Sequence, residues 1–196
     1  MIIVGLTGGI GSGKTTIGKY FNSIGIPIYI ADDEAKALMN RSKVIKRKLI
    51  TLFGEDAYTD KGLNRDYLAS KIFIDKTLLS KMNAIVHPKV ALHFKRWLKK
   101  QKAPYVIKEA AIIFENKLED QYHFIITVIA DKSNRIKRVI ERDNVTEDRV
   151  LAIMNNQLSD EEKEKQSDFV IINNKLEQAY KQAYTIHNKI LQNIRQ

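Results

Sequence analysis

The chain contains 196 residues, 44% of them hydrophobic, which is sufficient for one full-sized core with insertions and argues against disorder. Apolar residues nowhere continue for the ~20 positions of a membrane-spanning helix, and no basic leader precedes the first apolar run. The sequence has no cysteine, so disulfides, thiolate nucleophiles and cysteine-based zinc sites are excluded. We therefore expect a cytoplasmic protein without a membrane partner.

The formal net charge of +10 indicates anionic partners or serves solubility, because net charge says little about fold. A nucleic acid would need a long basic stripe with stacking aromatic residues, whereas a phosphorylated small molecule needs only a few cations around one pocket. A basic cluster around Trp97 consists of Lys95, Arg96, Lys99, Lys100 and Lys102. Such a run on an amphipathic helix is usually a solvated face, so we expect small-molecule substrates and no nucleic acid.

The first predicted elements are a strand at 2–6 and a helix at 14–21, with a glycine-rich run between them. This run matches the pattern G-x-x-x-x-G-K-[ST], which between a strand and a helix predicts a phosphate-binding loop. Glycines let backbone N–H groups surround an anion, and the helix N-terminus adds partial positive charge. We expect Lys14 to reach the β- and γ-phosphates and the Thr15 hydroxyl to ligate Mg²⁺. The predicted ATP-binding residues of the loop are Gly8, Gly9, Ile10, Gly11, Ser12, Gly13, Lys14, Thr15 and Thr16.

A second strand of buried type is expected at 26–30, and two acidic residues that favour a helix start, Asp32 and Asp33, follow it. Residues 33–103 show no strand-like alternation, and we expect helices throughout. Pro88 disfavours helical backbone in its predecessor, so one helix should end before it and another should begin at it. This insertion has the position of an acceptor-binding module, although periodicity alone predicts only that it packs.

Three further strand-like runs at 105–107, 124–130 and 169–172 are separated by helical segments, which is typical of parallel strands with crossover helices. The predicted fold class is α/β: a three-layer P-loop NTPase fold with a mostly parallel sheet of about five strands, a helical acceptor-binding insertion and a helical lid. The predicted domains are a nucleotide-binding core at 1–32 and 104–196, a lid at about 132–156 within it, and a helical acceptor subdomain at 33–103.

A helix after the fourth strand should carry Arg135, Arg138 and Arg142 on one face. Arg138 and Arg142 could close over the phosphates as a mobile lid and stabilise transition-state charge, although exposed helix arginines are usually solvated. Asp131 imitates the acidic end of a Walker-B strand, but a cap for this helix is the more ordinary reading.

The last helices are expected to start at Thr146, at a capping box made by Ser159 and Glu162, and after Asn173. The inner face of the C-terminal helix is predicted to comprise Leu176, Ala179, Tyr180, Ala183, Ile186, Ile190 and Leu191.

Phosphoryl transfer needs an acceptor hydroxyl in line with the γ-phosphate, a carboxylate to take its proton, and cations for the transferring group. Asp32 is the preferred general base because ligands of open α/β sheets gather beyond the carboxyl ends of the strands; as the alternative, it only caps the next helix. Glu109 follows the third strand and could hold a metal ion through water. His87, before a proline, is by pattern more often structural than a ligand, and the histidine spacing gives no transition-metal site.

Taken in order, several segments resemble the dephospho-CoA kinase family over nearly the whole chain. The matching positions are the run 6–16, Ala31 with Asp32, His87 with Pro88, the run 112–116, the run 141–143, Gln157 and the run 168–173.

This resemblance implies transfer of the γ-phosphate of ATP to the ribose 3′-hydroxyl of dephospho-CoA, the last step of coenzyme A biosynthesis, with Mg²⁺ and by a monomer or weak homo-oligomer. It implies that Asp32 and Lys14 are catalytic together with the lid arginines Arg138 and Arg142, and that Asn173 lies near the adenine. The acceptor site that it implies consists of Thr7, Asp32, His87 and Glu115.

Two positions depart from the family pattern: Ile30 replaces the first acid of the usual Asp-Ala-Asp, and Ala111 replaces a common proline. Two other functions stay open on the residues alone. One is a kinase for another small acceptor, such as a nucleoside or nucleotide. The other is a nucleotide-dependent switch or nucleic-acid-associated ATPase, against which the lack of a convincing Walker-B aspartate counts.

Overall fold

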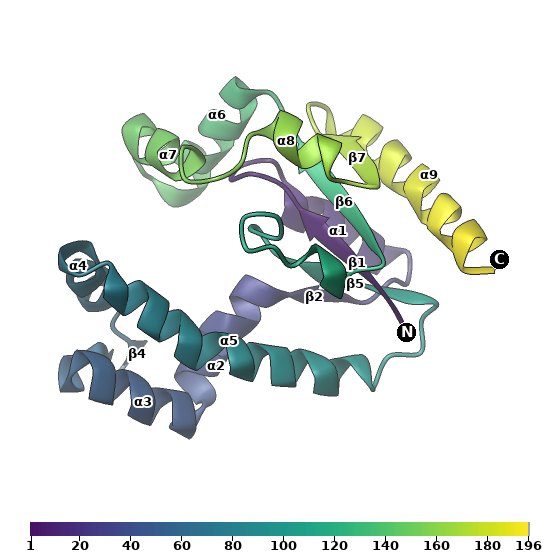
Figure 1. The fold of residues 1–196 in the computed structure, drawn as a ribbon. Helices are drawn as coiled ribbons and strands as arrows, with labels where there is room; N and C mark the ends of the chain where they lie inside the picture. The colour runs from purple at the N-terminus through teal and green to yellow at the C-terminus, as the bar shows by residue number, and fades with distance from the viewer. Residues whose placement is uncertain (196) are drawn as a thin grey trace. The chain divides into compact units, whose positions relative to one another are not determined.

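A computed structural model describes residues 1–195. They form two compact units (Figure 1). The first combines Met1–Ile30 with the described residues from Gln101 onward, and the second is Ala31–Lys100.

The first unit contains one five-stranded, fully parallel sheet in the order β2-β5-β1-β6-β7. This confirms the predicted α/β class with about five parallel strands. The strands are β1 (Ile2–Thr7), β2 (Ile28–Ile30), β5 (Tyr105–Glu109), β6 (Phe124–Ile129) and β7 (Phe169–Ile172). Because β1 lies at the centre, the loop that follows it leaves the sheet at the middle of its carboxyl edge.

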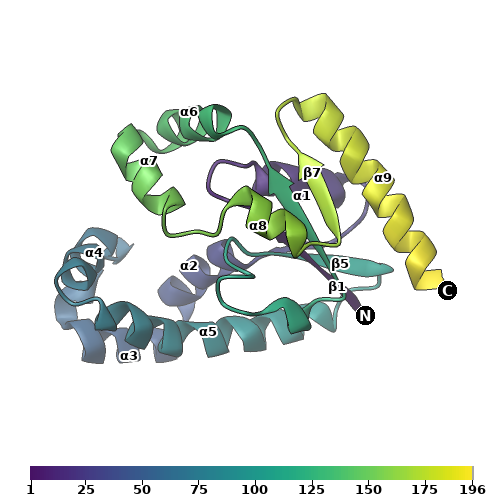
Figure 2. The same cartoon turned by 45° about the horizontal axis from the view of Figure 1, so that its top comes forward.

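Helices lie on both sides of this sheet, and α9 follows one side along its length (Figure 1). Figure 2 shows α6 and α7 as a packed pair joined by a short turn. The helices of the first unit are α1 (Lys14–Ser23), η2 (Glu119–Gln121), α6 (Lys132–Asp143), α7 (Glu147–Met154), α8 (Asp160–Lys165) and α9 (Leu176–Arg195).

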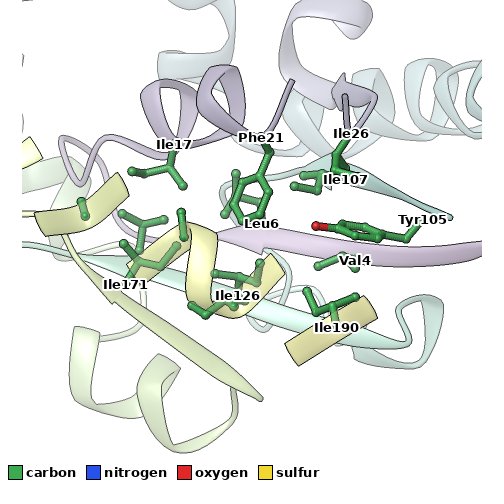
Figure 3. Close-up of a cluster of buried hydrophobic side chains, with 14 residues drawn as sticks. Val4, Leu6, Ile17, Phe21, Ile26, Tyr105, Ile107, Ile126, Ile171 and Ile190 are labelled. Atoms are coloured by element: carbon green, nitrogen blue, oxygen red, sulfur yellow. The ribbon is translucent and has the colours of Figure 1, made fainter. Parts of the chain in front are cut away.

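The main core lies between the sheet and the pair α1 and α9 (Figure 3). Alternate residues of a strand face the same side, so Val4 and Leu6 of β1 both enter this core. Ile17 and Phe21, one turn apart on α1, pack onto them, and Figure 3 shows these side chains together. The predicted inner face of the C-terminal helix agrees with the structure except at Leu176, which is 45% exposed at the first position of α9.

The opposite face of the sheet is covered by the chain that follows β5. Ile113 and Phe114 are buried there against Ile125, which faces away from its neighbours in the main core. A Cβ atom on Gly5 would lie 2.9 Å from the terminal methyl of Ile113 and 3.0 Å from the Tyr122 ring, so glycine lets these side chains pack closely on the strand.

The second unit is mainly helical, but it also contains a small antiparallel hairpin between β3 (Tyr58–Thr59) and β4 (Gly62–Leu63). The prediction of helices throughout 33–103 was therefore wrong at this point, because strands of two residues are too short to show alternation. The helical elements are α2 (Ala31–Arg41), α3 (Lys43–Phe53), η1 (Glu55–Ala57), α4 (Arg65–Ile74) and α5 (Thr77–Leu98). Their core is formed by Ile45, Leu49, Phe53, Ala57, Leu68 and Val86.

The predicted helix break at Pro88 was also wrong, since α5 continues through it. Val86 and Phe94 are buried on either side of the proline, at 3% and 7% exposure. Tertiary packing of both halves thus outweighs the single backbone hydrogen bond that a proline removes. Among the described residues, no helix is both long and apolar enough to span a membrane.

Candidate active site

The phosphate-binding loop connects the central strand β1 to α1 and presents the first turn of that helix at the carboxyl edge of the sheet. Gly13 is the N-cap residue with φ 92°, and no side chain caps the helix. The ladder of α1 starts with the bond from the Ile17 N–H to the Gly13 carbonyl, at 3.1 Å. The N–H groups of the first turn therefore have no partner within the helix, which is the arrangement that binds anions.

Two glycines of the loop are required by close contacts. Gly8 has φ 145°, and a Cβ atom there would lie 2.2 Å from the Val128 carbonyl oxygen. At Gly13, a Cβ atom would lie 2.2 Å from the amide nitrogen of Asn173. A larger residue at Gly8 would meet the backbone of β6, and one at Gly13, where φ is 92°, would displace the Asn173 side chain from the loop.

The functional side chains of the motif are held by neighbouring oxygens. The Lys14 ammonium donates to the carbonyls of Gly8 at 2.9 Å and of Gly9 at 3.3 Å. The Thr15 hydroxyl lies 3.2 Å from both carboxylate oxygens of Glu109, a residue that is 5% exposed. Thr15 and Glu109 thus place hydroxyl and carboxylate oxygens together, the donor type that Mg²⁺ prefers.

Asn173 and Arg138 contact the backbone of the loop. The Asn173 side chain donates to the Ser12 carbonyl at 2.8 Å. The Arg138 guanidinium donates to the carbonyl of Asn173 at 2.8 Å and to that of Gly11 at 3.4 Å. The end of β7 and the helix α6 therefore both reach the phosphate-binding loop.

Arg142 lies on the same helix as Arg138 but has different partners. Its guanidinium donates twice to Asp143, at 2.7 Å each, and its side chain is 64% exposed. The hydrogen bond to this carboxylate raises the pKa of Arg142. Of the two predicted lid arginines, the structure brings Arg138 to the loop, whereas Arg142 is paired with its neighbour.

Sequence reasoning missed a group of side chains that holds Ile10. The Ile10 N–H donates to Gln157 at 2.8 Å, and its carbonyl accepts from Arg135 at 2.9 Å. Arg135 also forms an ion pair with Asp160 at 2.8 Å. Only the family resemblance pointed to Gln157, and nothing in the local pattern separates Arg135 from an ordinary helix arginine.

Two residues of the implied acceptor site have partners inside the first unit. Thr7 is fully buried, and its hydroxyl donates to the Ala111 carbonyl at 3.3 Å. Glu115 accepts from the buried Lys163 ammonium at 2.5 Å and from the Leu158 N–H at 3.1 Å.

The other two residues, Asp32 and His87, belong to the second unit. Asp32 is the second residue of α2, two positions after the end of β2, and its side chain is exposed. It lies in the first turn of the helix, where a carboxylate also favours the helix dipole. His87 is exposed on α5.

The expectation that the Asp131 side chain caps α6 was wrong. Asp131 occupies the N-cap position of α6 without a capping bond, and its backbone N–H and carboxylate exchange hydrogen bonds with the Asn174 side chain at 2.8 and 2.9 Å. Residues 1–195 contain no group of three acidic or histidine side chains that could hold a metal ion. The Thr15–Glu109 pair is therefore the arrangement to consider for a cation.

A fully parallel sheet whose central strand ends in a phosphate-binding loop, with a lysine, a hydroxyl and a carboxylate gathered there, defines a P-loop nucleotide-binding protein. The sequence model of the dephospho-CoA kinase family matches residues 2–178. The chain belongs to this family.

Individual relatives agree with this assignment. A dephospho-CoA kinase of Bacteroides fragilis is 36% identical over 173 residues, which cover 88% of this chain and 84% of that protein. Among solved structures, a Thermus thermophilus protein is similar with a TM-score of 0.88, 32% identity and 97% coverage of both chains. A dephospho-CoA kinase from Campylobacter jejuni has a TM-score of 0.69 at 22% identity, with 96% of both chains covered, and supports the fold.

Proposed function

We propose that this protein is an ATP-dependent kinase that phosphorylates the ribose 3′-hydroxyl of dephospho-CoA and so completes coenzyme A biosynthesis. The observation that carries the proposal is the phosphate-binding loop on the central strand, within a chain that matches the dephospho-CoA kinase family over residues 2–178. ATP and dephospho-CoA are both polyanions, and the net charge of +10 on the protein attracts them electrostatically. Since ATP is abundant in the cytoplasm, we also place the enzyme there.

The loop grips the triphosphate by its backbone and by Lys14. The N–H groups of residues 14–16 supply donors and partial positive charge, and Lys14 exchanges the carbonyls of Gly8 and Gly9 for phosphate oxygens. Asn173, which directly follows β7, is the residue that we propose to lie near the adenine.

Thr15 and Glu109 fit a magnesium ion, because they combine a hydroxyl with an almost fully buried carboxylate at 3.2 Å. Thr15 would hold the ion directly and Glu109 through water. When bound with ATP, Mg²⁺ neutralises charge on the β- and γ-phosphates.

Asp32 is the proposed general base. Its carboxylate accepts the proton of the acceptor 3′-hydroxyl while that oxygen forms its bond to the γ-phosphorus and ADP leaves. Its exposed position in the first turn of α2 leaves the carboxylate accessible to a substrate. His87 of α5, also exposed, is a proposed contact of the acceptor.

Arg138 and Arg142 are the proposed cationic groups of the lid. Arg138 donates to the carbonyl of Asn173 at 2.8 Å and to that of Gly11 in the loop at 3.4 Å, so a small rotation of its long side chain can move the guanidinium from carbonyl to phosphate oxygens. Arg142 has to leave Asp143 to take part. Its role therefore requires a change in the conformation of its side chain.

The test compares turnover of ATP with dephospho-CoA in the wild type and in Asp32→Asn, which keeps the size of the side chain but cannot accept the proton. Turnover should fall at least 100-fold, since general base catalysis contributes about 10²–10⁴-fold. Asp33→Asn is the matched control, because Asp33 is adjacent and already paired with Lys36 at 3.3 Å. Undiminished turnover in Asp32→Asn would remove Asp32 as the base, and a preference for another acceptor in a substrate screen would remove dephospho-CoA as the substrate.

A further inference from the structure

We infer that Gln157, Arg135 and Asp160 form a clamp on Ile10, so that the segment 157–160 between α7 and α8 sets the conformation in which the phosphate-binding loop receives the triphosphate. The inference rests on the proposed function for the identity of the nucleotide. These three side chains act as positioning residues, because their partners are protein atoms of the loop.

The clamp holds both backbone polar groups of one residue. The Ile10 N–H donates to the Gln157 side-chain carbonyl at 2.8 Å, and the Ile10 carbonyl accepts from Nε of Arg135 at 2.9 Å. Because its N–H is used in this way, Ile10 does not present a donor to phosphate. The sequence-based assignment of Ile10 to the ATP-binding donors thus becomes an assignment to positioning.

The segment 157–160 holds the loop from two of its own positions. Gln157 binds Ile10 directly, and Asp160, three residues later, binds Nη1 of Arg135 at 2.8 Å. The Arg135 and Asp160 side chains are only 10% and 19% exposed, so their attraction is weakly screened by solvent. The segment therefore acts on both sides of the same residue.

The segment itself has a buried anchor. Oε1 of Glu115 accepts the Leu158 N–H at 3.1 Å and the ammonium of the fully buried Lys163 at 2.5 Å. Leu158 lies between the two clamp residues of the segment and also packs against the cluster of Ile113. Its backbone is thus fixed to the body of the first unit, which makes it a firm support for the loop.

The loop is also shaped to receive Arg135. A Cβ atom on Gly9 would lie 2.0 Å from Nη2 of Arg135, and one on Gly11 would lie 2.4 Å from its carbonyl oxygen. The glycines that flank Ile10 are thus in contact with the clamp. Movement of α6 would be transmitted to the loop through this contact.

The test is the substitution Gln157→Met, which keeps the length of the side chain but removes the acceptor for the Ile10 N–H. The affinities for Mg²⁺–ATP and for AMP are measured by calorimetric titration without the acceptor. Because AMP lacks the β- and γ-phosphates, the comparison separates binding of these phosphates from binding of the nucleoside end. The control is Asn156→Leu, which removes the adjacent exposed amide, bonded only within its own turn to Ala152 at 2.9 Å.

We expect Gln157→Met to bind ATP about 3- to 10-fold more weakly, the effect of losing one ordinary hydrogen bond and leaving its donor unpaired. In this variant the affinity for AMP, the KM for dephospho-CoA and the unfolding midpoint should stay at their wild-type values. In Asn156→Leu these three quantities and the affinity for ATP should all stay at their wild-type values. Unchanged ATP affinity in Gln157→Met, or an equal loss for ATP and AMP, would overturn the inference. Wild-type turnover with dephospho-CoA is measured separately, so failure of the proposed function is recognised independently.

A second measurement tests whether Gln157 and the Arg135–Asp160 pair act on the same residue, Ile10. Asp160→Asn removes the charge that holds Arg135 and should also weaken ATP binding. In the double variant with Gln157→Met, the loss should be smaller than the product of the single losses, because both changes release Ile10. A loss equal to that product would show two independent contacts and refute the clamp.

Discussion

Replacing Glu115 by alanine should destabilise the fold strongly, because the partner that remains is a buried cation. The Lys163 side chain is 0% exposed, and its ammonium lies 2.5 Å from the Glu115 carboxylate. Removing one member of a buried ion pair costs about 3–5 kcal/mol, since the other charge is left uncompensated. In a chain of this length, about 2–4 °C of unfolding midpoint corresponds to 1 kcal/mol, so the midpoint should fall by about 6–20 °C.

Differential scanning calorimetry of the purified variants measures this shift. Glu177→Ala is the matched control, because Glu177 pairs with Lys181 at 2.7 Å while both side chains are 81% and 75% exposed. Exposed pairs of this spacing contribute about 0.3–0.5 kcal/mol, so the control should move by no more than about 2 °C. The reasoning is refuted if Glu115→Ala unfolds like the wild type but has a raised KM for dephospho-CoA, the result expected of a residue that serves only the acceptor.

Three further predictions concern the loop and the C-terminal helix. Lys14→Ala should abolish turnover and leave the unfolding midpoint nearly unchanged in calorimetry, since the Lys14 ammonium lies at the phosphate-binding loop, where it donates to the carbonyls of Gly8 and Gly9; a collapsed fold would contradict this. Gly8→Ala should lower both the midpoint and ATP affinity, because its Cβ would lie 2.2 Å from the Val128 carbonyl at φ 145°, and wild-type values would disprove the contact. Burial lowers the pKa of His187, which bonds the Tyr105 hydroxyl at 2.8 Å. The unfolded chain then binds more protons below about pH 6.5, so the wild type should lose more stability on acidification in urea titrations than His187→Gln, and equal losses would contradict this.

The sequence predicted the parts of the site that depend on neighbours along the chain. The loop after β1 and the start of α1 at Lys14 follow from glycine conformation and helix start signals, which act over a few residues. The capping box of Ser159 and Glu162 was found for the same reason and is present in the structure. Local chemistry of this kind can be read without the fold.

The parts that could not be predicted depend on contacts between distant segments. Arg135 and Asp160 are 25 residues apart, and Glu115 and Lys163 are 48 apart, so no local pattern pairs them. The continuous helix through Pro88 has the same explanation, because burial on both sides of the proline decides its course. Propensity gives a prior that tertiary packing can outweigh.

The donors that surround the phosphate-binding loop explain how it stays ready for an anion. The carbonyls of residues 8–12 all accept from side chains, which are those of Lys14, Arg135, Arg138 and Asn173. In a trans peptide the N–H of the next residue points away from the carbonyl, so fixing these oxygens also fixes the amide directions. Amides fixed before the substrate arrives need little reorganisation to meet the negative charge of a phosphate, which is the property that makes such groups effective in catalysis. In the proposed mechanism the cations of the site therefore act twice, first by orienting the loop and then, for Lys14 and Arg138, by exchanging carbonyl oxygens for those of the nucleotide.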